Sequence, residues 1–281
     1  MTAAGIDKKH GLDVTVVPIS ATGQQWLSLR SGSADVGSGS VLDLLRQRQA
    51  GLHVRAFMTF QTYNNPVVVP ANSPIKAYPD LAGKKVGTPD ASLLDFMILR
   101  AAGKKAYNLD VGTQATPTPA SPTLLLELLS KGQIDAALDF SSLTATPVAQ
   151  GKLRVLLTVP QIMQQASFNP KSFYLLISAT DAWNQQHPGG VAKLHDAEVE
   201  TFQMLMTQDA PWTALAKEVG ITDPAQVAGY MKSQRAVFQL DYSSLLLDAT
   251  TSLMNDLISV NGKDAVGISG VDPNAFIFPS Q

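Results

Sequence analysis

Two acidic residues, Asp90 and Asp139, stand out among the side chains of this sequence that could do chemistry. Each lies in a candidate loop at the carboxyl end of a predicted strand and shortly before a Ser typical of a helix start. A carboxylate at such a position attracts a positively charged or hydrogen-bond-donating group and repels an anion. Because no Arg or Lys lies in the candidate loops described next, the pair predicts a neutral, zwitterionic or amine-bearing ligand, and a heteroaromatic compound would fit.

Six short segments rich in small and polar residues are expected at the carboxyl ends of strands. They span residues 20–24, 38–40 and 61–64 in the first half and 88–92, 117–121 and 139–142 in the second. Free backbone N–H groups at helix starts, and glycines that let a ligand approach the backbone, favour binding there. The candidate ligand-binding residues are Ser20, Thr22, Gly23, Gln24, Ser38, Gly39, Ser40, Tyr63, Asn64, Thr88, Asp90, Ala91, Ser92, Asp139, Phe140 and Ser141.

Each of these residues also has a purely structural interpretation. Ser, Thr and Asn commonly cap helices and form turns. The rings of Tyr63 and Phe140 either stack on a planar ligand or pack against their neighbours. Asp90 would then cap a helix, and Asp139 would face solvent or pair with a base. The six segments together favour a binding site more strongly than any single residue does.

Motifs for catalysis and for cofactors are missing from the sequence. It has no Cys, and its four His residues, at positions 10, 53, 187 and 195, lack metal-ligand spacing. Residues 37–41 (GSGSV) do not have the spacing of a G-x-S-x-G elbow, and no Walker or dinucleotide-binding fingerprint is present. We therefore expect no catalytic residue, no metal and no cofactor.

Length and composition indicate a folded protein with a sizeable core. The chain has 281 residues, of which 45% are hydrophobic and 16% charged, which suffices for two domains. Its net charge of −2 provides no basic surface for nucleic acid. No run approaches the roughly 18 apolar residues of a membrane helix, and no secretory signal is visible.

The elements that must position the candidate loops alternate between strands and helices. The patterns predict strands at 12–17, 34–37, 53–60, 66–70, 85–88, 109–116, 134–140, 153–159 and 173–178. They predict helices at 2–9, 24–30, 41–49, 92–107 and 122–131 and over much of 189–260, with 92–95 as a capping box. This order favours an α/β fold with mainly parallel sheets.

An internal repeat divides the chain into two similar α/β halves. Residues 29–36 follow the same pattern as 129–136, and residues 11–14 follow that of 108–111. We expect lobe one to comprise 1–78 and 176–281, with a helical C-terminal part, and lobe two to comprise 79–175. The chain should cross between them near 70–84 and 170–176. The repeat also predicts that a central strand of the first sheet, with its ligand loop, lies upstream of Met1.

Four of these segments carry a resemblance to a known family. Residues 5–14 (GIDKKHGLDV), 31–37 (SGSADVG), 80–87 (DLAGKKVG) and 132–137 (GQIDAA) resemble, in this order, motifs of one family. It comprises the ABC-importer solute-binding proteins of the nitrate/sulfonate/taurine and thiamine-pyrimidine-precursor type. The resemblance is clear over residues 5–160 and covers the helical tail only in outline.

This resemblance implies a type II periplasmic-binding-protein fold, with two lobes joined at two hinge crossings. One small solute would be held in the cleft, and hinge closure would create a surface for a membrane permease. A monomer outside the cytoplasm is the expected form. Two alternatives stay open: an enzyme of this fold acting on a small heteroaromatic or a thiamine- or menaquinone-pathway intermediate, and the effector domain of a regulator. The iron-dependent synthases of this fold use cysteine motifs, which this chain lacks.

Overall fold

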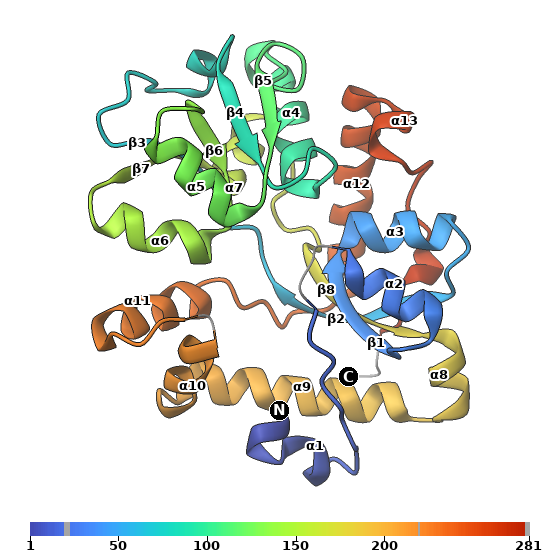
Figure 1. Cartoon of the computed structure of the whole chain (residues 1–281). Coiled ribbons are helices and arrows are strands. Elements are labelled where there is room, and N and C mark those ends of the chain that lie inside the picture. The colour runs from blue at the N-terminus through green and yellow to red at the C-terminus, as the bar shows by residue number, and fades with distance from the viewer. Residues whose placement is uncertain (20–22, 219, 279–281) are drawn as a thin grey trace.

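The computed structural model describes residues 1–19, 23–218 and 220–278 and contains two β-sheets. The three-stranded sheet has the order β1-β8-β2, and the five-stranded sheet has the order β5-β4-β6-β3-β7. Figure 1 shows these sheets in two separate α/β lobes. The strands are β1 Val36–Ser40, β2 Val54–Gln61, β3 Pro66–Pro70, β4 Lys85–Thr88, β5 Thr116–Pro119, β6 Ala136–Leu138, β7 Leu153–Thr158 and β8 Leu175–Thr180.

Helices flank both sheets and make up most of the C-terminal third of the chain. They are α1 Ile6–Lys9, α2 Gln24–Ser31, α3 Val41–Gln49, α4 Leu94–Tyr107, α5 Pro122–Ser130, α6 Ser141–Ala149, α7 Val159–Gln165, α8 Asp181–Gln186, α9 Gly190–Thr207, α10 Ala210–Glu218, α11 Pro224–Arg235, α12 Ser244–Asn261 and α13 Lys263–Val266. Most predicted helices are confirmed within a few residues. None of the described helices is long and apolar enough to span a bilayer.

Alternating side chains of the five-stranded sheet bury its two faces against different helices. Val68 and Ala137 pack with Leu125 and Leu129 of α5. Val67 and Val69 belong to the other cluster, which includes residues of α4 and α7. This period-2 burial is typical of a strand covered on both faces. In the three-stranded sheet, β8 is central and almost wholly buried, as its continuous apolar run predicts.

The chain crosses between the sheets at residues 62–65 and 166–174, between β2 and β3 and between α7 and β8. The first crossing therefore precedes β3, and the prediction that placed it at 70–84 is wrong. The reason is that β3, read as the last strand of the first half, pairs with β6 and β7 of the second sheet. The second crossing includes the predicted range 170–176 up to the start of β8.

The α/β fold class is confirmed, but the expectation of mainly parallel sheets is wrong. Both pairs of the three-stranded sheet are antiparallel. In the five-stranded sheet, β4 is parallel to β5 and β6, whereas β3 is antiparallel to β6 and β7. The antiparallel strands, β3 and β8, are those that enter a sheet directly after a crossing. They arrive from the other lobe and so run against their neighbours.

The internal repeat corresponds to two matching helix–strand–helix units. Unit α2-β1-α3 matches α5-β6-α6 at an offset of one hundred residues, and both first helices are followed by a left-handed glycine, Gly32 or Gly132. The order β1-β8-β2 then corresponds to β6-β3-β7. In the five-stranded sheet, β4 and β5 continue the sheet beyond β6. Among the described residues, no strand continues the smaller sheet beyond β1 in the same way.

Two predicted strands, at 12–17 and 109–116, are not formed. Among the described residues no strand pairs with residues 12–17, and Val16 and Val17 are 69% and 50% exposed. At the second position Asp110 accepts a hydrogen bond from the backbone N–H of Gly112 and pairs with Arg100, which stabilises a turn. The strand of this region, β5, starts only at residue 116.

The C-terminal helices contact both lobes. Helix α9 packs beside β2 and α1, α11 lies against α6, and α12 lies against α4. Figure 1 shows α9–α11 below the five-stranded lobe and α12 beside it. The lobe boundaries predicted from the sequence, 1–78 with 176–281 and 79–175, assign this tail to lobe one. The contacts of α11 and α12 show that it also packs against lobe two.

Candidate functional site

The first group of predicted residues lies around α2 and β1. Gly23, with a φ of 85°, is the N-cap of α2, and Gln24 is the first residue of this helix. Ser38, Gly39 and Ser40 belong to β1 rather than to a loop after it. Ser20 and Thr22 lie outside the described residues. The structure therefore brings the described members of this group to one helix–strand unit of lobe one.

Ser40 has the structural role that its residue type also allowed. Its hydroxyl oxygen accepts a hydrogen bond from the backbone N–H of Asp43 at 3.1 Å and donates to the Asp43 carboxylate at 2.7 Å. This arrangement caps α3. Ser40 is therefore fully used inside the protein, whereas Ser38 is exposed.

Gly39 lets a buried tryptophan approach the strand. A Cβ atom at this position would lie 2.4 Å from Cζ2 of Trp26, so only glycine fits under this ring. The indole Nε1 of Trp26 and the Oε1 atom of Gln25 are buried and have no hydrogen-bond partner among the described residues. Neither residue was predicted for the site. Their position directly after the predicted residues Gly23 and Gln24 was the available signal.

The loop after β4 is organised by its own hydrogen bonds. The Asp90 carboxylate accepts from the backbone N–H of Ser92 at 2.7 Å, and the Thr88 hydroxyl donates to the Asp90 carbonyl at 3.1 Å. Asp90 and Ser92 are exposed and Thr88 is buried, with Ala91 between these extremes. Asp90 thus forms a turn. It does not cap α4, which was the alternative to ligand binding, because the N-cap of this helix is Leu93.

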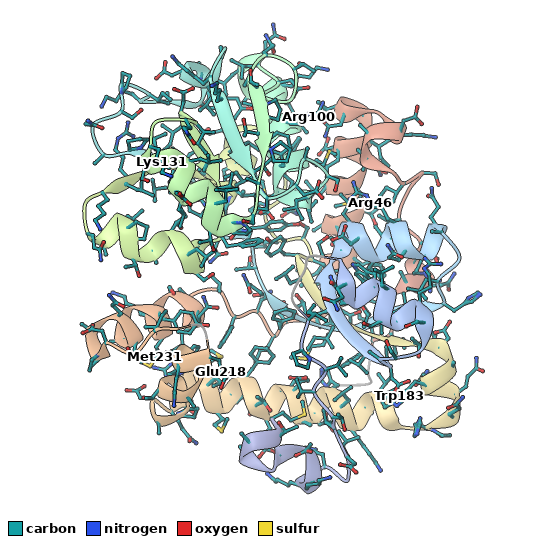
Figure 2. All side chains as sticks on the ribbon, in the orientation of Figure 1. Arg46, Arg100, Lys131, Trp183, Glu218 and Met231 are labelled. Carbon is teal, nitrogen blue, oxygen red and sulfur yellow. The ribbon has the colours of Figure 1, made fainter. Side chains whose placement is uncertain are left out.

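Arg46 of α3 connects this loop to lobe one. Its guanidinium donates to the carbonyl of Ser92 at 2.8 Å and to that of Val266 at 2.8 Å, and it pairs with Asp43 at 3.4 Å. Figure 2 shows Arg46 where α3 approaches the upper lobe and the C-terminal helices. This cation is therefore engaged by internal acceptors.

Asp139 is the most unusual of the predicted residues. It lies between β6 and α6 and is 1% exposed. Its Oδ1 accepts from the backbone N–H of Phe140 at 2.7 Å, whereas its Oδ2 has no partner among the described residues. Burial raises the pKa of Asp139 to about 7. The structural alternative to ligand binding, in which Asp139 faces solvent or pairs with a base, is therefore wrong for the described residues. Phe140 and Ser141 follow Asp139 into the start of α6.

The first crossing contacts this segment directly. The Asn64 amide donates to the Ser141 hydroxyl, and Asn65 accepts from the Ser141 backbone N–H at 3.2 Å. The Oδ1 atom of Asn64 is buried without a partner in the described part of the chain. The structure thus brings together Asn64 and Ser141, which are far apart in the sequence, and places Asp139 two residues away.

Tyr63 is a packing residue of the crossings. It is 3% exposed, and its ring lies 4.4 Å from that of Tyr174. Its hydroxyl donates to the carbonyl of Phe173 at 2.9 Å and lies 3.1 Å from the Ser172 hydroxyl. These contacts agree with the packing alternative and leave no free polar group on Tyr63.

Asp95 contradicts the predicted capping box at residues 92–95. The N-cap of α4 is Leu93, without a side-chain cap, and the Asp95 carboxylate accepts from the Tyr174 hydroxyl at 2.6 Å. Burial raises the pKa of Asp95 to about 6. The sequence did not reveal this role, because an Asp three residues after a Ser fits both a capping box and an inward-facing side chain.

Two hollows in the surface lie away from these residues. One, of about 310 Å³, is lined by residues between 45 and 49 and between 269 and 272. The other, of about 560 Å³, lies between residues 4–6 and 200–208. Neither includes a predicted ligand-binding residue, so the candidate site rests on the buried polar atoms.

The arrangement of the described residues is one for binding. Eight described side chains have a buried polar atom without a partner, and four of them lie in or beside candidate segments: Gln25 and Trp26 in α2, Asn64 in the first crossing and Asp139 after β6. Buried polar atoms normally have partners, so these four groups are candidates for contacts with a ligand. No cluster of His, Cys, Asp and Glu that could hold a metal occurs in the described part of the chain.

Solved structures with the same fold include proteins that bind sulfonates. The alkanesulfonate-binding protein SsuA of Xanthomonas axonopodis pv. citri, bound to MOPS, matches 99% of this chain and 92% of its own, with a TM-score of 0.78 and 16% identity. The periplasmic aliphatic sulphonate binding protein SsuA of Escherichia coli matches 92% and 82%, with a TM-score of 0.76 and 20% identity.

An enzyme shares the architecture as well. The desulfurization enzyme DSZB matches 92% of this chain and 87% of its own, with a TM-score of 0.62 and 16% identity. At these identities the similarity shows the fold, which is the predicted two-lobed periplasmic-binding-protein type II fold. No curated protein sequence matches the chain.

A family model gives the relationship at the level of sequence. The model described as "NMT1/THI5 like" matches residues 7–210, which include both sheets and both crossings. This match confirms the family resemblance that the four sequence motifs indicated. The chain belongs to the NMT1/THI5-like family.

Proposed function

We propose that this protein is the solute-binding component of an ABC importer. It captures a small organic solute between the lobes by hinge closure and delivers it to a membrane permease. The observation that carries the proposal is the set of buried, unpartnered polar atoms on Gln25, Trp26, Asn64 and Asp139. These residues come from both lobes and from the first crossing, so a ligand held by all of them would connect the parts that a hinge moves.

The two crossings support this mechanism. Open α/β sheets bind ligands beyond the carboxyl ends of their strands, where Asp139 lies. In the described part of the chain, residues 62–65 and 166–174 carry the backbone between the two sheets, so changes in their torsions can alter the angle between the lobes. Such a motion would also change the contacts of α11 and α12 with lobe two. The permease partner and a location outside the cytoplasm belong to the same proposal, because a carrier of this type works at the outer face of a membrane.

Binding without turnover is favoured over catalysis. The chain has no Cys to serve as a nucleophile, and the described contacts of His10, His187 and His195 are with Glu200, with a backbone carbonyl and with Asp196. None of these pairs places a His beside a Ser or Thr that it could activate. Nothing in the described residues favours the enzyme alternative.

Native mass spectrometry of the gently purified protein tests the proposal. We expect one small molecule to travel with the protein at a stoichiometry of one. The same compound, added to stripped protein at 100 times its dissociation constant, should stabilise the fold by about 2.7 kcal/mol and raise the melting temperature. If the protein consumed the compound, the enzyme alternative would replace the proposal, and if no compound bound, solute binding would be refuted.

A further inference from the structure

We propose that Asp139 selects the solute, and that the solute presents a protonated amine or amidine to it, not a sulfonate or another anion. This inference rests on the proposed solute-binding function and identifies the chemical class of the solute. It differs from the ligands named for the structurally similar SsuA proteins, which are sulfonates. The contacts of the described loops carry it in three steps.

The first step is the free oxygen of Asp139. The side chain is 1% exposed and its Oδ2 has no partner among the described residues. Amides such as Asn64 and Gln25 can present either an oxygen or an N–H group to a ligand. An ionised carboxylate can only accept, whereas the indole N–H of Trp26 can only donate, so Asp139 is the member of this set that requires a hydrogen-bond donor on the solute.

The second step concerns the N–H groups that would otherwise bind an anion. Helix N-termini bind anions through free backbone N–H groups. Here the N–H of Ser92 bonds to Asp90, that of Phe140 to Asp139, and that of Ser141 to Asn65. At these three N–H groups an incoming sulfonate would have to displace acceptors that already belong to the protein.

The third step is the lack of a free cation. The candidate loops contain no Arg or Lys. Arg46 is the cation that reaches the loop after β4, and it is held by Asp43 and by the carbonyls of Ser92 and Val266. An anionic solute would therefore lose its hydration without gaining a positive partner, which is unfavourable.

Burial raises the pKa of Asp139 to about 7, which agrees with an acceptor that lacks its partner. A bound cation would lower this pKa and keep the carboxylate ionised. The exposed Asp90 has the opposite character because it is satisfied by its own turn. Substitutions of the two residues therefore make a test and its control. Asp139→Asn removes the proposed contact with the solute, and Asp90→Asn removes a carboxylate from another candidate loop.

The test measures thermal shift and calorimetric binding at pH 8 for the stripped wild-type protein, Asp139→Asn and Asp90→Asn. The probes are benzylamine, benzamidine and putrescine, with benzenesulfonate and 1-butanesulfonate, which lack an amine, as anionic counterparts. We expect at least one amine or amidine to bind and the sulfonates not to bind. Asp139→Asn should weaken that binding at least tenfold, and Asp90→Asn should change it less than twofold.

The outcomes separate this inference from the proposed function. Binding of a sulfonate with no amine would leave solute binding intact and overturn the selection by Asp139. Equal amine affinity in wild type and Asp139→Asn would overturn it as well. If no probe bound and no molecule travelled with the native protein, both proposals would fall. The melting temperature of ligand-free Asp139→Asn, expected to equal or exceed that of wild type at pH 8, confirms that this variant is folded.

Discussion

Tyr174 donates a 2.6 Å hydrogen bond to Oδ2 of Asp95 and so connects the second crossing to the first turn of α4. The amide of Asn65, in the first crossing, donates to the same Tyr174 hydroxyl at 2.8 Å. The ring of Tyr63 packs on that of Tyr174. Both crossings are therefore joined to each other and to lobe two through one tyrosine.

Removing this hydroxyl should destabilise the protein measurably. In Tyr174→Phe the buried Asp95 carboxylate loses its donor, and the pKa of Asp95 should rise further because this hydrogen bond holds it down. Leaving a buried polar group unsatisfied costs about 1–3 kcal/mol. Urea unfolding at pH 7 measures the loss. The control, Tyr107→Phe, removes an exposed hydroxyl bonded to Gln165 and should lose less than about 1 kcal/mol. Equal losses in the two variants would contradict a special role for Tyr174.

The buried carboxyls predict how stability depends on pH. The pKa values of Asp139 and Asp95 are raised to about 7 and about 6, so the folded state holds these protons more tightly than the unfolded chain does. Their contribution to stability is complete below the ordinary pKa of 3.8 and is lost as the pH rises through 7. Asp139→Asn removes the pH-dependent contribution of Asp139 to stability. The free energy of unfolding of the variant, relative to wild type, should increase between pH 4 and pH 8 by on the order of a few kcal/mol. A constant difference over this range would refute the raised pKa.

Solute affinity should depend on pH through the same group. The amine contacts the ionised form of Asp139, so affinity should fall about tenfold between pH 8 and pH 6 for a pKa near 7. No charged neighbour contributes to the shift of this pKa, and no ion pair to Asp139 occurs in the described part of the chain. Calorimetry with an amine that stays protonated over this range measures the slope. Asp139→Asn should abolish it, and an unchanged slope in the variant would assign the titration to another group.

Packing under Trp26 predicts the effect of a single methyl group. Gly39→Ala places a Cβ within 2.4 Å of the indole ring and should cost about 1–3 kcal/mol, the usual effect of overpacking. Gly229→Ala is the matched control, because it lies in an exposed part of α11 with no atom within 4 Å. This control should stabilise the protein by about 0.5–1 kcal/mol. Trp26→Phe should partly relieve the cost of Gly39→Ala in a double-mutant cycle, and strict additivity would show that the two residues do not touch.

Much of the fold follows from local sequence signals. The pattern of β8 is apolar throughout because this strand is central and covered on both faces, and helix 41–49 is bounded as predicted because Ser40 caps it. Strand pairing was less accessible. The sequence of β3 does not indicate which sheet this strand joins. Because β3 joins the five-stranded sheet, the first crossing comes before it, and β3 runs antiparallel to its neighbours β6 and β7.

The sequence indicates candidate segments for a site but not the roles of the individual residues in them. Asp90 and Asp139 have the same sequence context, yet one is exposed and satisfied by a turn while the other is buried with a free oxygen. Burial of this kind is set by neighbours distant in the chain, such as Asn64 beside Ser141. Gln25 and Trp26 were missed because their polar atoms matter only when nothing else in the fold bonds to them.

The edge of β1 that faces away from β8 has consequences for how the protein behaves at high concentration. Edge strands usually need protection by charge, by proline or by a covering segment, because their free N–H and C=O groups are a template for intermolecular pairing. β1 is built from Val, Gly and Ser alone, and the extended residues 12–19 expose Val16 and Val17. Among the described residues, this edge of the smaller sheet is therefore where a further strand, from the same protein or from a second copy, can pair.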